Sequence, residues 1–111
     1  MSDQEQLRSK LSEIGARYIN RTLTEIEQLK SFSENAAAGS KDALKELGTL
    51  AHRIRGSGAM FGYHAISKSA EAIEILANGG SLTEADVTVM RALVEDLSEE
   101  VKRAAKERGP A

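Results

Sequence analysis

Apolar residues recur every three or four positions in four successive segments of this chain, and no segment shows the strict alternation of a half-buried strand. This spacing predicts four amphipathic helices: at residues 3–37, from 41 to a break near 58–62, at 63–77, and from 84 onward. The positions predicted to face inward are Leu7, Leu11, Ile14, Tyr18, Ile19, Leu23, Ile26 and Leu29, then Leu44, Leu47, Leu50, Ala51, Ile54 and Gly58, then Ile66, Ala70, Ile73 and Ala77, and last Val87, Met90, Val94, Leu97, Val101 and Ala104.

Capping and turn residues separate these segments. Ser40 can cap the second helix, and Thr83 can form a capping box with Asp86 at the start of the fourth. Asn78-Gly79-Gly80 supplies the left-handed geometry that ends the third helix, and Gly15 allows a kink or split in the long first one. Because the connections are short, consecutive helices should be antiparallel. The sequence therefore predicts an all-α protein, an antiparallel up-down-up-down four-helix bundle.

The composition suits a single domain spanning residues 1–111, with 41% hydrophobic residues and a formal net charge of -2. Because no concentrated basic face is present, no nucleic-acid partner is expected. The chain has no cysteine, which excludes disulfides and thiolate metal sites, and no apolar run resembles a signal peptide or a membrane span. We expect a cytoplasmic monomer with no membrane partner.

The second helix carries His52 with a glycine four residues to either side, at Gly48 and Gly56. Each glycine inside a helix costs about 1 kcal/mol relative to alanine, so the pair indicates a surface that must stay bare. The helical projection turns His52 away from the inward positions. It places Lys41 and Lys45 beside the ring and no acidic residue of the same helix near it.

Glycines that serve helix packing should lie on the core face, and Gly58 fits that role. The projection instead places Gly48 and Gly56 on the outer face, beside the histidine. This arrangement favours an imidazole that a partner must approach closely over an incidental surface histidine.

The chemistry open to a lone exposed imidazole is narrow. Zinc needs three or four ligands, and His64 is the only other histidine, so no metal site is expected. A general base needs a pocket that excludes water, which a convex helix face does not provide. A histidine nucleophile served by a partner's catalytic groups remains, and phosphoryl transfer suits it.

The residues around His52 resemble the signature of histidine-containing phosphotransfer domains. The stretch that carries the resemblance is His52-Arg53-Ile54-Arg55-Gly56-Ser57-Gly58, followed by Phe61-Gly62 and then by Ile66 and Ala70. The resemblance implies that His52 accepts phosphate, that Arg55 is the basic residue three positions on, where lysine is usual, and that Gly56 is the small residue after it. It also implies a four-helix bundle that relays a phosphoryl group.

The same resemblance implies the partners and the cofactors. The partners are response-regulator receiver domains and a histidine kinase or hybrid kinase. The chain itself needs no cofactor, since Mg²⁺ is expected on the receiver, and no independent catalytic site is expected. Residues expected to meet a partner are Lys41, Lys45, Gly48, Ser57 and Ala59, with apolar support from Leu11, Gly15, Tyr18 and Met60.

Glu74 matches the position of a glutamate that, in the similar phosphotransfer domain of chemotaxis histidine kinases, hydrogen-bonds the histidine ring and fixes its tautomer. From sequence alone, a solvated helix flank is an equal alternative for Glu74, and Glu71 is a weaker candidate for the same role. Two alternatives for the whole chain also stay open: a helical adaptor that docks a partner noncovalently through the second helix, and a fragment of a larger kinase.

Overall fold

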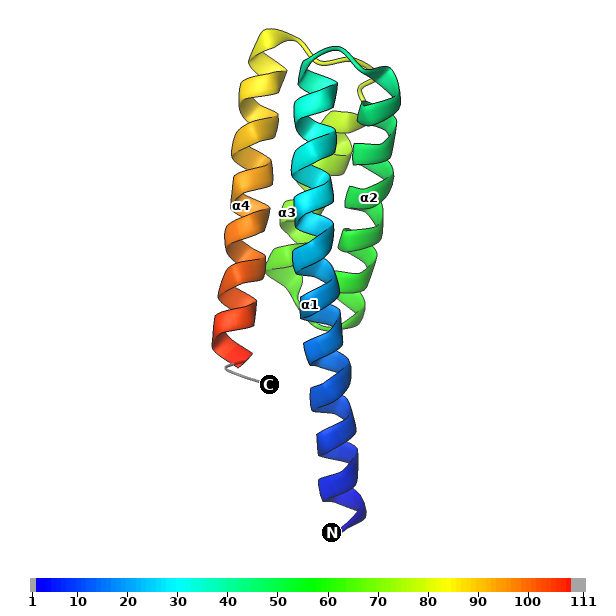
Figure 1. Ribbon diagram of the computed structural model, residues 1–111, viewed down its shortest axis with the longest axis vertical. Coiled ribbons are helices and arrows are strands. Elements are labelled where there is room, and N and C mark those ends of the chain that lie inside the picture. The colour runs from blue at the N-terminus through cyan, green and yellow to red at the C-terminus, as the bar shows by residue number, and fades with distance from the viewer. Residues whose placement is uncertain (1, 109–111) are drawn as a thin grey trace.

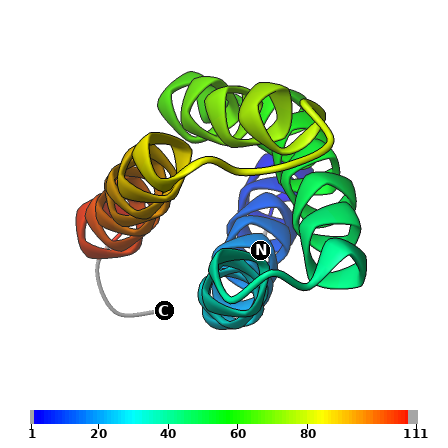
Figure 2. The same ribbon diagram turned by 90° about the horizontal axis from the view of Figure 1, so that it is seen from above.

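The computed structural model describes residues 2–108, which form four helices. They are α1 (Asp3–Ala37), α2 (Lys41–Met60), α3 (His64–Ala77) and α4 (Glu84–Arg108). Each helix runs antiparallel to the one before it, and α4 closes the ring by packing against α1 (Figures 1 and 2). The predicted all-α up-down-up-down bundle is confirmed.

Local side chains start two of these helices as the sequence predicts. The Ser40 hydroxyl accepts the backbone N–H of Ala43 at 3.1 Å and caps α2. At α4, Thr83 and Asp86 form the reciprocal capping box: the Asp86 N–H donates to Thr83 Oγ1 at 3.1 Å, and the Thr83 N–H donates to Asp86 Oδ2 at 3.0 Å. Gly80, with φ of +87°, supplies the left-handed residue after α3.

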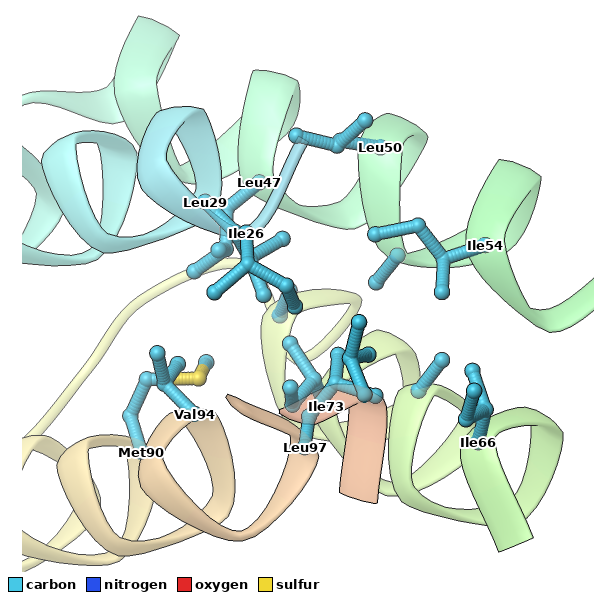
Figure 3. Packing of buried hydrophobic residues seen from close by; sticks show 14 of the residues in the cluster. Ile26, Leu29, Leu47, Leu50, Ile54, Ile66, Ile73, Met90, Val94 and Leu97 are labelled. Atoms are coloured by element: carbon cyan, nitrogen blue, oxygen red, sulfur yellow. The ribbon is translucent and has the colours of Figure 1, made fainter. Parts of the chain in front are cut away.

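The core lies along the axis of the bundle and is almost entirely aliphatic (Figure 3). All four helices contribute side chains that are fully buried or nearly so. The largest of these apolar side chains are Leu29, Leu47, Ile54, Ile66, Ile73, Met90, Leu97 and Val101. The inward positions predicted for α2 and α3 are all buried.

The first part of the α1 stripe departs from the prediction, because Leu7, Leu11 and Ile14 are exposed rather than buried. Helix α1 has 35 residues and α2 has 20, so the N-terminal turns of α1 extend beyond the end of the bundle (Figure 1). The periodicity is real, but no neighbouring helix among the described residues buries these three side chains. The molecule is accordingly elongated, with principal extents of 56 × 20 × 18 Å.

Gly15 does not interrupt α1, which runs as a single helix through this position. Gly15 is buried, and a β-carbon there would lie only 2.5 Å from Nη1 of Arg108, at the end of α4. The Arg108 guanidinium also donates a 2.6 Å hydrogen bond to the backbone carbonyl of Ser12. Gly15 therefore makes room for a side chain of another helix. The break in α1 that the sequence allowed at this position does not occur.

Candidate functional site

His52 lies in the middle of α2 with its side chain 64% exposed. Its Nδ1 atom is 2.6 Å from Oε2 of Glu74, on α3, whose side chain is only 13% exposed. An ionised carboxylate can only accept a hydrogen bond, so Nδ1 carries the hydrogen in this pair. The lone pair of the neutral ring is therefore on Nε2. Of the two alternatives for Glu74, the geometry matches the ring contact and not a solvated flank.

Arg55, one turn after His52, lies against the second oxygen of the same carboxylate. Its Nη1 atom is 3.0 Å from Oε1 of Glu74, an ion pair that lacks the alignment of a hydrogen bond. Glu74 thus joins the imidazole and the guanidinium. The sequence projection covered α2 alone and found no acidic residue near the ring; a neighbouring helix supplies one.

The two glycines around His52 have different surroundings. Gly56 is exposed, and a β-carbon there would meet nothing within 4 Å. Gly48 is buried, and its β-carbon would lie 3.4 Å from Cβ of Ala77 and 3.3 Å from Oδ1 of Asn78. The prediction that both glycines lie bare on the outer face is correct for Gly56 and wrong for Gly48, because α3 packs against α2 there.

A groove of about 520 Å³ runs from His52 along the contact between α2 and α3. Its lining residues are Lys41, Leu44, Lys45, Gly48, Thr49, His52, Glu74, Ala77, Asn78 and Gly80. The two lysines therefore share one surface with the histidine, as the projection places them. Thr49 and Asn78 were not predicted from sequence. Asn78 carried only a turn signal. Thr49 could have been found, because the helical projection that places Lys45 and His52 on this surface places Thr49 there too.

The other predicted contact residues lie outside this groove. Ser57 is half-buried and donates to the carbonyl of Ile54 at 3.2 Å, whereas Ala59 is exposed. Of the apolar candidates, Leu11 and Met60 are exposed, but Gly15 and Tyr18 are buried. Of these four candidates, only Leu11 and Met60 are exposed enough for an apolar contact with a partner.

A buried carboxylate beside the site was also missed from sequence. Glu25 of α1 is 6% exposed, and its Oε2 lies 3.6 Å from Nη1 of Arg53, the residue after His52. Oε1 lies 3.9 Å from Nε of Arg21, one turn earlier on α1. The only signal in the sequence was the spacing of Arg21 and Glu25, which is that of an i,i+4 ion pair. Such a pair does not show that Arg53 of α2 also lies against Glu25.

The described residues hold neither a metal-binding cluster nor a membrane-spanning helix. Within residues 2–108, no three histidine or carboxylate side chains come together in a way that could hold a metal ion. In the same part of the chain, none of the helices combines the length and the apolar character needed to cross a bilayer.

A four-helix bundle that presents a histidine on one helix, with its ring held by a carboxylate from the next, has the architecture of a phosphoryl carrier. The Hpt domain family matches residues 5–104, and the chain belongs to this family. Membership implies histidine phosphotransfer in a phosphorelay, and Hpt domains in general interact with histidine kinases and response regulators. Comparisons with curated proteins and with solved structures gave no match.

Proposed function

We propose that His52 accepts a phosphoryl group on Nε2 and exchanges it with the aspartate of a response-regulator receiver domain. The observation that carries this proposal is the 2.6 Å contact between Nδ1 of the exposed His52 and Glu74. Because Nδ1 is occupied by that contact and the ring is exposed, Nε2 is the nucleophile in this proposal. The other histidine, His64, is also exposed but begins α3 outside this arrangement.

The transfer needs no proton to move. The Nε2 lone pair attacks the phosphorus of an aspartyl phosphate, the P–N bond forms, and the P–O bond to the aspartate breaks, releasing a carboxylate. The hydrogen stays on Nδ1, so the ring becomes a phosphorylated cation. The Glu74 carboxylate then faces that positive charge, as the aspartate of a catalytic triad faces its imidazolium.

The surroundings of His52 have separate roles in this proposal. Gly56 leaves open space beside the ring, so a receiver can bring its Mg²⁺ and phosphoaspartate into line with Nε2. Arg55 is already paired with Glu74, and its planar guanidinium can also contact the transferred phosphoryl oxygens. The exposed Lys41 and Lys45 attract an acidic partner surface. The exposed Ala59 and the half-buried Ser57, on the α2 turn beyond Gly56, also meet the partner in this proposal.

The direct test is to incubate the protein with a phosphorylated receiver domain or an autophosphorylating histidine kinase and follow labelled phosphate. Wild type should acquire an acid-labile, alkali-stable label, and His52→Gln should acquire none. His64→Gln is the matched control, since it removes the other histidine from an exposed helix start, and it should be labelled like wild type. Label that persists in His52→Gln would rule out this site. Unchanged downstream signalling in that variant would instead support a noncovalent adaptor.

A further inference from the structure

Two glycines of α2 lie directly against α3. At Gly48 an added β-carbon would lie 3.4 Å from Cβ of Ala77, and at Gly58 it would lie 3.1 Å from the backbone nitrogen of Ser67. Both distances are at or below ordinary van der Waals contact. The side chains of α2 that would hold the two helices apart are therefore missing at two points, one before and one after His52.

The pair formed by His52 and Glu74 lies between these two points. His52 is one turn after Gly48 on α2, and Glu74 is three residues before Ala77 on the antiparallel α3. Near Gly58, the Ser67 hydroxyl donates to the carbonyl of Arg55 at 2.9 Å and ties the helices together at the other end. The separation of the two backbones is thus fixed on both sides of the histidine.

The ring contact tolerates little change in that separation. Nδ1 and Oε2 are 2.6 Å apart, and about 1 Å of additional distance removes a hydrogen bond altogether. Glu74 has limited freedom to follow the ring, because its side chain is mostly buried on α3.

We propose that Gly48 is a positioning residue for His52: by admitting Ala77 against the α2 backbone, it sets the helix separation at which Glu74 holds the hydrogen on Nδ1. Gly58 fixes the same separation from the other end. In relation to phosphotransfer, this rests on the proposed function, because it concerns the availability of Nε2. The contact itself can be tested without any phosphoryl donor.

The chain offers a matched pair of sites for the test. Gly48 and Gly56 are each four residues from His52 in the same helix, but only Gly48 has α3 against it. Replacing glycine with valine changes the helix propensity by the same amount at either position, so a difference between Gly48→Val and Gly56→Val reports packing and not backbone preference. Gly48→Ala is the intermediate step, since its single methyl meets the movable Asn78 amide and the fixed Ala77 methyl.

The readout is the set of imidazole nitrogen chemical shifts of His52 in ¹⁵N-labelled protein, recorded at a pH above which these shifts no longer change. Wild type and Gly56→Val should show hydrogen on Nδ1. In Gly48→Val the tautomer with hydrogen on Nε2 should become the major form, with a smaller increase in Gly48→Ala. Replacing Ala77 with glycine in the Gly48→Val background returns one methyl of space and should restore part of the Nδ1 form.

Three outcomes would overturn the inference: a wild-type ring spectrum in Gly48→Val, equal loss in both valine variants, or, where Gly48→Val does not fold, a wild-type spectrum in Gly48→Ala. The result is independent of phosphorylation. If labelling persists in His52→Gln, the proposed function fails while the tautomer result stands. If the tautomer is unchanged, this inference fails while His52 can still accept phosphate.

Discussion

Tyr18 carries a polar group into the end of the bundle where α2 ends and α3 begins. It is 2% exposed, and its ring stacks on Phe61 and Tyr63 with centroid distances of 4.6 and 5.4 Å. Its hydroxyl is buried without a hydrogen-bond partner among residues 2–108. Burial raises the pKa of this hydroxyl, and the nearby hydroxyls of Ser57 and Thr22 only partly oppose that effect.

We predict that the ring of Tyr18 stabilises the fold and that its hydroxyl does not. Tyr18→Phe should leave the free energy of unfolding within about 1 kcal/mol of wild type, since it removes an unpaired buried polar group and keeps the stacking. Tyr18→Ala should lose about 3–5 kcal/mol, as large-to-small aromatic changes in cores do. Urea denaturation measures both free energies of unfolding. A loss of about 2 kcal/mol or more in Tyr18→Phe would show that the hydroxyl has a hydrogen-bond partner in solution.

The raised pKa of Tyr18 also gives the sign of a pH effect. A group whose pKa is higher in the folded state adds stability that is fully present below its unfolded value, about 10 for tyrosine. That stability is lost as the pH rises through the folded pKa. Tyr18→Phe should therefore lose less stability than wild type in alkaline solution. Tyr63→Phe is the control, because Tyr63 is less buried.

Single residues also show where sequence reasoning ends at this site. His52, Arg55 and Gly56 lie in one helix, so periodicity alone predicts that they share a surface. Glu74 lies on another helix, and the resemblance gave its position but not its contact. The environment of Gly48 was predicted wrongly for the same reason: a projection of α2 does not include the register of α3, which depends on packing across the whole interface.

The starts of α2 and α4 could be predicted because their signals are local. Each capping hydrogen bond joins residues three positions apart, Ser40 with Ala43 and Thr83 with Asp86. No tertiary contact is therefore needed to set these boundaries. Helix α3 begins at His64, after Tyr63, which makes no side-chain capping bond. Its start was still predicted to within one residue from the glycine break before it.

We predict that the capping box accounts for much of the local stability of the first turn of α4. Thr83→Ala should lower the free energy of unfolding by about 1 kcal/mol, the usual cost of losing an N-cap hydroxyl. Thr88→Ala is the control, because Thr88 is exposed in the same helix and its hydroxyl donates only a long hydrogen bond, 3.4 Å, to the Glu84 carbonyl. Thr83→Ser keeps the acceptor and should restore most of the loss. Equal effects of the two alanine variants in thermal or urea unfolding would contradict this role.

The overall shape could be predicted less completely than the helices. Periodicity gave the correct length of α1, but the prediction that its whole apolar stripe is buried was wrong at Leu7, Leu11 and Ile14, because burial depends on where the other helices end. Helix α2 ends at Met60 and α3 begins at His64, so the stripe continues at Leu7 and Leu11 past the last turn that could cover it. Hydrophobic pattern alone does not report that mismatch in length.

Arg108, in the last turn of α4, contacts the N-terminal half of α1. Its guanidinium lies over Gly15, donates to the Ser12 carbonyl at 2.6 Å, and approaches the Tyr63 hydroxyl at 3.4 Å. N-terminal to this contact, the turns of α1 have backbone hydrogen bonds but bury little apolar surface. Helix ends of this kind open locally without unfolding the core.

We therefore predict a sharp boundary in amide hydrogen exchange along α1. Amides of residues 6–12 should exchange by local fraying, whereas those of residues 22–36 should need global unfolding. Arg108→Ala should move the boundary inward, lowering protection at Ala16 and Arg17 and leaving Leu29 unchanged. Lys106→Ala, an exposed change at the same end of α4, should not move it. Protection in residues 6–12 equal to that of the core would contradict this boundary, because the exposed face of Leu7 and Leu11 would then have to be covered in solution by another molecule.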